Sequence, residues 1–246
     1  APDNTVAHHP PDLIYGQLPV SPNDLSAEPD ADCNLCPRLV AFRQDCAASE
    51  PLWFNGAVRS FGDSRTARLM IVGLAPGLRG ANRTGRSFTG DQSGALLYAT
   101  LLEFDFARGN YGGHADDGLH LVDTIVTNAV RCVPPANKPN SSELNTCRAF
   151  LTGLLRAMGQ LRVIVALGRV AHDSILSALE RRKASHKFAH GARHELGGDL
   201  VLFDSYHCSR YNTNTGRLTP EMFQEVFRRV RAEIGIDPSP QKKPLR

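Results

Sequence analysis

The sequence predicts a single α/β domain in which helices cover both faces of a central four-stranded parallel sheet. Short, nearly continuous apolar runs alternate along the chain with longer segments of helical spacing, and this alternation is typical of parallel strands joined by helical crossovers. The runs lack the polar–apolar alternation of a half-exposed strand, which indicates strands buried on both faces. A hydrophobic content of 41% with 22% charged residues is that of an ordinary globular protein.

Four strands and four helices follow from this pattern. The expected strands are 68–77, 123–132, 161–168 and 199–207, and the expected helices are 93–104, 140–158, 169–180 and 219–235. Ser93 is the predicted N-cap of the first helix, and Asn140 and Glu143 have the spacing of a capping box at the second. Thr219 is the predicted cap of the last helix, with Pro220 in its first turn.

Composition limits the classes of protein that remain. The formal net charge is +3, which is compatible with a nucleic-acid partner but is not evidence for one. No apolar run approaches the ~20 residues of a membrane span, and residues 1–13 contain neither the basic region nor the apolar core of a signal peptide. We therefore expect a cytoplasmic protein with no membrane partner. Residues 1–30 and 236–246 are expected to be a flexible arm and tail around one domain at 31–235.

Three polar segments leave predicted strands at their carboxyl ends, at 73–91, 127–139 and 206–216. In an open parallel sheet the functional site lies beyond these ends, so we expect the segments to converge. The first, GLAPGLRGANRTGRSFTGD, matches neither common Gly-rich nucleotide-binding pattern, which disfavours a dehydrogenase or an NTPase. Gly73 and Gly77 allow close backbone approach. Phe88 is either a loop anchor or an exposed contact, and Asp91 is either a helix N-cap or a functional carboxylate.

The cysteines predict a metal centre. Cys33 and Cys36 form a C-x2-C pair, Cys132 follows the second predicted strand, and Cys147 lies on the next helix. In a reducing compartment such a tight pair favours a metal over a disulfide. A redox pair or buried apolar thiols are the alternatives. The spacing leaves zinc and an iron–sulfur cluster both open.

The motifs GLAPG and NRTGRSFTGD, then TNAVRCVPPANKP, and finally H-x-S-R-x-N-x-N-T-G occur in this order along the chain. Together with the cysteines they resemble the uracil-DNA glycosylase superfamily, and within it family 5, the B-type iron–sulfur enzymes. The resemblance covers roughly residues 33–230. Leu74 stands where the neighbouring family 4 has an acidic residue, which favours family 5. One departure is Cys208, which stands where relatives carry Pro after the motif histidine.

That resemblance implies a DNA-repair enzyme that flips a nucleotide out of the duplex and hydrolyses the N-glycosidic bond of uracil, and of other deaminated bases such as hypoxanthine. The implied catalytic residues are Asp91, which positions the attacking water, and His207, which donates a hydrogen bond to the charge developing on the base. The implied base-binding residues are Leu74, Ala75, Phe88, Asn128 and Asn137. The expected partner is DNA, bound by a nucleoid-associated monomer.

The resemblance also implies a [4Fe-4S] cluster and a DNA-contacting surface. The implied cluster ligands are Cys33, Cys36, Cys132 and Cys147, and their role is structural, because cleavage of an N-glycosidic bond needs no redox step. The implied DNA-binding residues are Arg79, Arg83, Arg210, Tyr211, Asn212, Asn214 and Arg217. Of these, Tyr211 or Arg210 is the expected wedge that fills the space vacated by the flipped base.

Two other classes of protein fit part of the sequence. A metal-stabilised nucleic-acid-binding protein without catalysis would account for the thiols and arginines, but it leaves Asp91, Phe88 and His207 without a role. A metal-dependent hydrolase on the same fold would need an open coordination position, and the set of four thiols is too complete for one.

Overall fold

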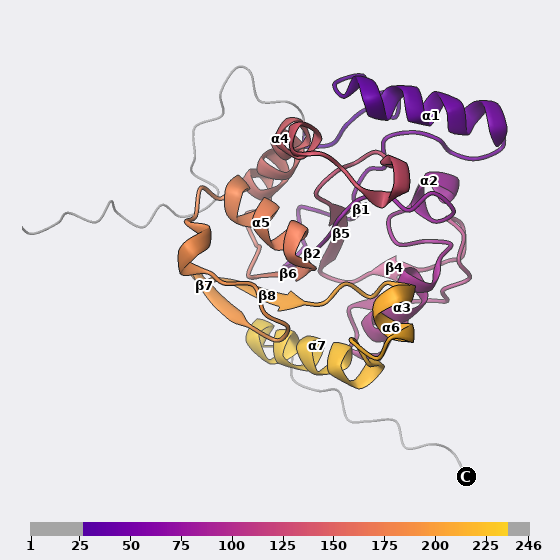
Figure 1. The fold of residues 1–246 in the computed structure, drawn as a ribbon. Helices are drawn as coiled ribbons and strands as arrows, with labels where there is room; N and C mark the ends of the chain where they lie inside the picture. The colour runs from indigo at the N-terminus through magenta and orange to yellow at the C-terminus, as the bar shows by residue number, and fades with distance from the viewer. Residues whose placement is uncertain (1–26, 236–246) are drawn as a thin grey trace, which may run out of the picture.

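The computed structural model describes residues 27–235, so the predicted tail and most of the predicted arm lie outside the described residues. Within this part of the chain a sheet of six strands has the order β1-β5-β2-β6-β8-β7 (Figure 1). Its four central strands run parallel to one another and correspond to the four predicted strands. These strands are β2 (Leu69–Gly73), β5 (Thr124–Asn128), β6 (Val163–Leu167) and β8 (Leu200–Ser205).

The two edge strands correct the predicted number of four. β1 (Phe61–Gly62) pairs antiparallel with β5, and β7 (Arg193–Gly197) pairs antiparallel with β8. β1 has only two residues, and β7 is a polar strand with mostly exposed or half-exposed side chains. Neither strand therefore carries the continuous apolar run that identified the buried strands. A separate two-stranded ribbon consists of β3 (Ala107–Arg108) and β4 (His120–Leu121).

Two predicted helices cover each face of the sheet. On one face lie α3 (Gln92–Glu103) and α7 (Pro220–Ile234), and on the other lie α4 (Ser141–Ala157) and α5 (Arg169–Ala178) (Figure 1). Within β2, Leu69 and Ile71 pack in the first layer, whereas Met70 and Val72 pack in the second. Successive strand residues point to opposite faces. Because both faces are covered, every residue of β2 is apolar or Gly and buried.

The helix caps agree with the sequence at two of three predicted positions. Asn140 and Glu143 form the complete capping box of α4, and the Thr219 side chain accepts a hydrogen bond from the Met222 amide at the start of α7. At α3 the cap is Asp91 instead of Ser93, because the helix begins at Gln92, one residue before the predicted start. This shift ties a candidate catalytic side chain to a helix end.

Several short or weakly patterned helices were not predicted. They are α1 (Pro37–Ser49), α2 (Ala81–Thr84), α6 (Arg210–Asn214), and the 3₁₀ turns η1 (Pro135–Asn137) and η2 (Lys183–Ser185). The buried side chains of α1 are those of Leu39, Arg43 and Cys46. The arginine interrupts the apolar stripe that would have predicted a helix. The segment expected as a polar loop after His207 instead forms α6, capped by the Ser209 side chain. No helix in residues 27–235 has both the length and the apolar character needed to cross a membrane.

Candidate active site and cysteine centre

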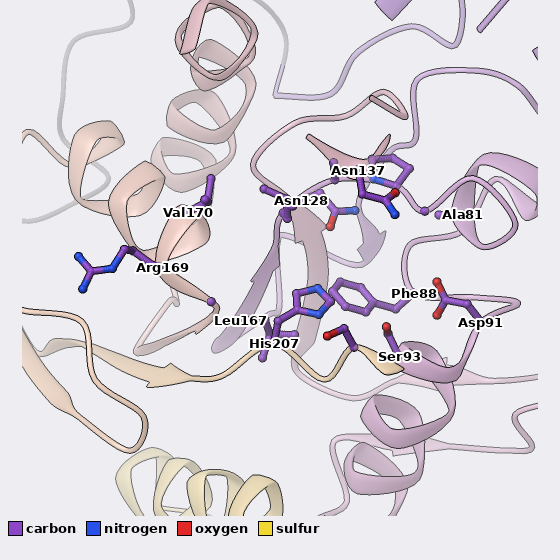
Figure 2. A pocket seen from close by; sticks show the side chains of 16 residues that line it. Ala81, Phe88, Asp91, Ser93, Asn128, Asn137, Leu167, Arg169, Val170 and His207 are labelled. Atoms are coloured by element: carbon purple, nitrogen blue, oxygen red, sulfur yellow. The ribbon is translucent and has the colours of Figure 1, made fainter. Parts of the chain in front are cut away.

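A cavity of about 390 Å³ opens beyond the carboxyl ends of the central strands. This volume lies in the usual range for small-molecule sites. The three polar segments meet here, as expected from the topology of the sheet. Figure 2 shows the cavity, and its lining contains all seven residues predicted for catalysis and base binding, Leu74, Ala75, Phe88, Asp91, Asn128, Asn137 and His207.

Two stacked rings form one wall of the cavity. The centroids of the Phe88 and His207 rings are 5.9 Å apart, and the ring planes are 26° from parallel. The Phe88 ring lies close above Gly73, where an added Cβ would overlap it and would also come within 2.5 Å of the Asn128 Oδ1. The close approach predicted at Gly73 therefore has a specific cause, which is the placement of Phe88 over the end of β2.

Asp91 combines the two alternatives that the sequence left open. Its Oδ1 accepts a hydrogen bond from the Gly94 amide at 3.0 Å and caps α3. Its Oδ2 turns the other way, so that a Cβ at Gly80 would lie 2.5 Å from it and a Cβ at Gly77 would lie 3.1 Å from it. The cap fixes the carboxylate, while Asp91 still contributes to the cavity lining.

The surroundings of His207 favour its neutral imidazole form. Burial lowers its pKa below the usual 6.5, and the nearby Asp91 carboxylate opposes this shift without cancelling it. Among the described residues, no group forms a hydrogen bond with its buried Nδ1. The loop around it is fixed from both sides, because Asn212 Nδ2 donates to the His207 carbonyl at 2.8 Å and the Cys208 thiol donates to the Ser93 carbonyl at 3.4 Å.

Asn128 provides the second unsatisfied polar atom of the cavity. Its side chain is 2% exposed, and its Nδ2 donates to the Ser87 hydroxyl over a long 3.4 Å. Its Oδ1 is buried without a partner in residues 27–235. A buried acceptor without a donor is costly, so this cavity fits a ligand that presents an N–H group. Asn137 lies at the exposed rim with a positive φ of 55°.

The sequence analysis missed a fourth segment of the cavity, the turn between β6 and α5. Leu167, Gly168, Arg169 and Val170 all line the cavity, and Figure 2 shows Arg169 and Val170 at its edge. The signal was present, because this turn also follows the carboxyl end of a parallel strand. It was overlooked because it is short and was assigned directly to the start of a helix.

The seven predicted DNA-contacting residues do not line the cavity, and they lie in the segments that surround it. Arg79 is exposed. Arg83 donates to the Gly90 carbonyl at 3.1 Å, next to Asp91. Arg210 donates to Gln92 Oε1 at 2.9 Å, which connects α6 to the first turn of α3.

The remaining predicted contacts lie on or just after α6. The Tyr211 side chain is 72% exposed, and Asn214 is exposed one turn later. The Arg217 guanidinium lies 4.6 Å from the centroid of the Tyr206 ring. An exposed aromatic side chain beside arginines is compatible with insertion into a nucleic acid.

The four predicted ligand cysteines surround one small buried space. Cys33, Cys36, Cys132 and Cys147 line this space together with Leu39 and Phe150. All four are free thiols, and the Arg131 amide donates to the Cys147 sulfur at 3.2 Å. Four soft thiol donors around one space fit a thiolate-bound metal cluster.

Burial disfavours the thiolate form at this cysteine centre. Burial, with a smaller contribution from the neighbouring thiols, raises the pKa of Cys132 to about 12 and that of Cys147 to about 11. The buried Arg43 guanidinium opposes this shift at Cys132, but it also donates to the Ala31 and Cys33 carbonyls. Because a metal binds the deprotonated form, it would offset the cost of gathering four thiolates here.

Comparison with known proteins assigns the fold and cavity to a family. The family model of the uracil-DNA glycosylase superfamily matches residues 59–231. A type-5 uracil-DNA glycosylase of Thermus thermophilus is 45% identical to this chain, over 83% of the chain and 94% of the relative. A type-5 uracil-DNA glycosylase of Mycobacterium tuberculosis is 40% identical, over 83% of the chain and 79% of the relative.

The chain is also similar, at lower identity, to a type-4 enzyme. A type-4 uracil-DNA glycosylase of Sulfurisphaera tokodaii is 28% identical to the chain, over 70% of the chain and 72% of the relative. The α/β fold with its site at the carboxyl ends of the strands is therefore that of a glycosylase-type domain. The chain belongs to the uracil-DNA glycosylase superfamily, in its type-5 group, and the predicted family is confirmed.

Proposed function

We propose that this chain is a DNA-repair glycosylase that hydrolyses the N-glycosidic bond of uracil and leaves an abasic site. Family membership supports this function. The observation that carries it is the cavity in which Asp91, neutral His207 and the Phe88 ring come together. A base stacked inside a duplex could not reach this cavity, so the nucleotide would be flipped out of the helix.

His207 would stabilise the leaving base. Cleavage leaves the electron pair of the C–N bond on the base, and negative charge grows on its O2 atom. A neutral imidazole can donate one N–H to that oxygen, and the buried setting strengthens such a hydrogen bond. The lowered pKa of His207 supports this role, because the residue would remain neutral at physiological pH.

Asp91 would act on the sugar side of the bond. Its Oδ1 is occupied at the end of α3, which leaves the Oδ2 to orient a water molecule. That water would supply the hydroxyl group that bonds to C1′ of the sugar and would release its other proton to solvent by way of Asp91. The departing base would take up a proton from solvent, so that the reaction balances. The carboxylate charge would also favour the positive charge that develops on the sugar.

The remaining cavity residues would recognise the base. Phe88 would stack on its face, and the amide of Asn128 would pair with its Watson–Crick edge, where the unsatisfied Oδ1 can accept the uracil N–H. The backbone at Leu74 and Ala75 would contact O2, and Asn137 would add a contact at the rim. A cavity of about 390 Å³ with the apolar Leu74 at its wall also supports acceptance of hypoxanthine.

The surrounding surface would bind the duplex as a monomer. Four arginines, Arg79, Arg83, Arg210 and Arg217, would contact phosphates. Tyr211, with its 72% exposed side chain, would enter the base stack, while Asn212 and Asn214 would shape the turn. Such an enzyme would act in the cytoplasm, at the nucleoid.

The cysteine centre would hold a [4Fe-4S] cluster. Cys33, Cys36, Cys132 and Cys147 would be its ligands, and the cluster would supply a rigid crosslink between the segment before α1, the segment after β5 and α4. The Arg131 amide would donate to one of the ligating sulfurs. Glycosidic hydrolysis uses none of its redox chemistry.

Base release under single-turnover conditions tests the enzymatic function. Duplexes with one uracil or one hypoxanthine would be mixed with excess protein and treated with alkali, which cleaves at abasic sites. We expect release of both bases. Asp91→Asn should slow release by about 10²–10⁴-fold, because Asn keeps the helix cap and loses only the charge. The control is Asp63→Asn, in the segment between β1 and β2, which does not line the cavity. This variant should release bases at the wild-type rate.

Each outcome of that experiment separates the alternatives. Release of uracil alone would support the uracil-DNA glycosylase activity and exclude hypoxanthine as a substrate. Binding of DNA without release of either base would instead support the non-catalytic metal-stabilised binding protein. Iron and sulfide analysis tests the cluster independently, because a [4Fe-4S] protein is brown and contains both elements, whereas a zinc protein is colourless.

A further inference from the structure

Phe88 occupies an unfavourable backbone conformation. Its φ is 55°, in the left-handed region that bulky residues rarely adopt. Strain of this kind persists only where the surrounding structure enforces it. Phe88 is also the residue whose ring stacks on His207. The groups that hold its peptide in place therefore control the shape of the cavity.

A single hydroxyl group holds the chain on both sides of Thr89. Tyr111, which lies between β3 and β4, donates from its hydroxyl to the Phe88 carbonyl at 3.3 Å. The same hydroxyl accepts a hydrogen bond from the Gly90 amide at 3.3 Å. Gly94 makes room for this contact, because a Cβ there would overlap the Phe88 carbonyl and lie 2.5 Å from the Tyr111 hydroxyl. Asp91 follows directly after the held peptide.

A buried ion pair holds Tyr111 in turn. Arg86 and Asp117 form two hydrogen bonds of 2.8 and 2.6 Å, and their side chains are 6% and 1% exposed. The Arg86 guanidinium lies 6.0 Å from the centroid of the Tyr111 ring. Asp117 also accepts from the Gly112 amide at 2.9 Å, next to Tyr111 in the chain. Arg86 donates to the Thr89 hydroxyl at 2.8 Å, which closes the connection back to the loop.

We propose that Tyr111 is a positioning residue for this reaction. Its hydroxyl, on a ring that lies beside the Arg86–Asp117 pair, fixes the Phe88 peptide and with it the ring that stacks on the captured base. This inference rests on the proposed function. Misplacement of a reacting group by about 1 Å can cost about 10²-fold in rate. Because Tyr111 holds the peptide by two long hydrogen bonds, we expect its hydroxyl to contribute about 10-fold.

The test is Tyr111→Phe, which removes one oxygen and keeps the ring. Single-turnover release of uracil should slow about 10-fold, while the Kd for a duplex carrying a non-hydrolysable uracil nucleotide should stay within about twofold, since the arginines remain. Thr100→Val is the matched control, because it removes a buried hydroxyl–carbonyl hydrogen bond inside α3. This control should leave the rate unchanged.

A double-mutant cycle separates positioning from general stability. If Tyr111 acts through Phe88, then Tyr111→Phe should change the rate less than about twofold in a Phe88→Ala background, because coupled residues are not additive. An equal loss in both backgrounds would overturn the proposal. So would an unchanged rate in the single variant.

Hydrogen exchange at the Gly90 amide adds a measurement that does not depend on activity. Loss of its acceptor should speed Gly90 exchange in Tyr111→Phe and leave it unchanged in Thr100→Val. If the wild-type protein released no base, the proposed function would fail. Unchanged Gly90 exchange in Tyr111→Phe would overturn only the positioning role.

Discussion

His207 and His172 are two histidines near the same end of the sheet, and their surroundings are opposite. His207 follows β8 and has an Nδ1 without a partner in the described part of the chain. His172, on α5, is 1% exposed and has a hydrogen-bond partner at each ring nitrogen. Burial lowers the pKa of His207. At His172 burial also acts to lower the pKa, but the hydrogen bond and charge of Asp204 outweigh it and raise the pKa.

The hydrogen bonds of His172 determine its protonation. Its Nε2 lies 2.8 Å from the His186 carbonyl, which can only accept, so this nitrogen carries a proton. Its Nδ1 lies 2.7 Å from an Asp204 oxygen, and this contact also needs a proton. The other Asp204 oxygen lies 2.9 Å from the His194 Nε2. Asp204 thus favours the protonated, cationic form of His172, which joins α5 to β8.

The two histidines differ in whether the chain itself completes their hydrogen bonds. The ring nitrogens of His172 and the carboxylate of Asp204 are satisfied by the chain itself. His207 Nδ1 and Asn128 Oδ1, on two residues that line the cavity, have no partner in residues 27–235. Unsatisfied buried atoms lower stability. Their position at the cavity is explained when a ligand completes their hydrogen bonds.

The largest expected effect is the loss of stability when His172, the histidine with two hydrogen-bond partners, is replaced. His172→Leu leaves the Asp204 carboxylate buried without its cationic partner, and loss of one partner of a buried pair costs about 3–5 kcal/mol. Urea denaturation would measure the change in the free energy of unfolding. The exposed pair of Arg162 and Asp199 is the control, and Arg162→Leu should change stability far less. A similar small change in both variants would contradict a buried ion pair at His172.

Replacement of His207, whose Nδ1 has no partner in the described residues, is expected to have a smaller effect, on the reaction rate instead of on stability. His207→Gln should slow single-turnover release of uracil by about 10²–10³-fold. Its free energy of unfolding should change little, because the native Nδ1 has no hydrogen-bond partner to lose. Stopped-flow or quenched-flow assays and urea denaturation would measure the two quantities on the same sample. A large loss of stability would show that His207 is a structural residue instead.

The smallest expected effect is a pH dependence of opposite sign at the two histidines. The pKa of folded His172 is raised above 6.5, so its contribution to stability is fully present below pH 6.5 and is lost as pH rises through the folded pKa. Asp204, His194 and Asp173 are the titratable groups that face it. Stability should therefore decline on the alkaline side of pH 6.5 in the wild-type protein.

The pKa of folded His207 is lowered below 6.5. The unfolded chain therefore binds a proton more readily there, and stability falls as pH drops through 6.5. Urea midpoints across the pH range would measure both trends. His172→Leu should lose only the alkaline decline, and His207→Gln only this part of the acid decline. Parallel profiles in all three proteins would refute both assignments.

Much of this molecule could be predicted from the sequence because local rules apply to it. Parallel strands covered on both faces must be nearly continuous apolar runs, and this requirement identified β2, β5, β6 and β8. Capping residues identified the starts of α4 and α7. The rule that sites lie beyond the carboxyl ends of parallel strands predicted that the three polar segments meet. The seven cavity residues within them were implied by the family resemblance, and all seven line the cavity.

Tertiary structure alone decided which groups meet across long distances in the chain. Arg86 and Asp117 are 31 residues apart, and His172 and Asp204 are 32 apart. No periodicity encodes such pairs, because hydrogen-bond partners depend on how whole elements pack. The same holds for Asp91, whose two oxygens serve a helix end and the cavity only because α3 begins at the next residue. The chain thus determines its elements locally, and packing determines which of their polar atoms remain free for chemistry.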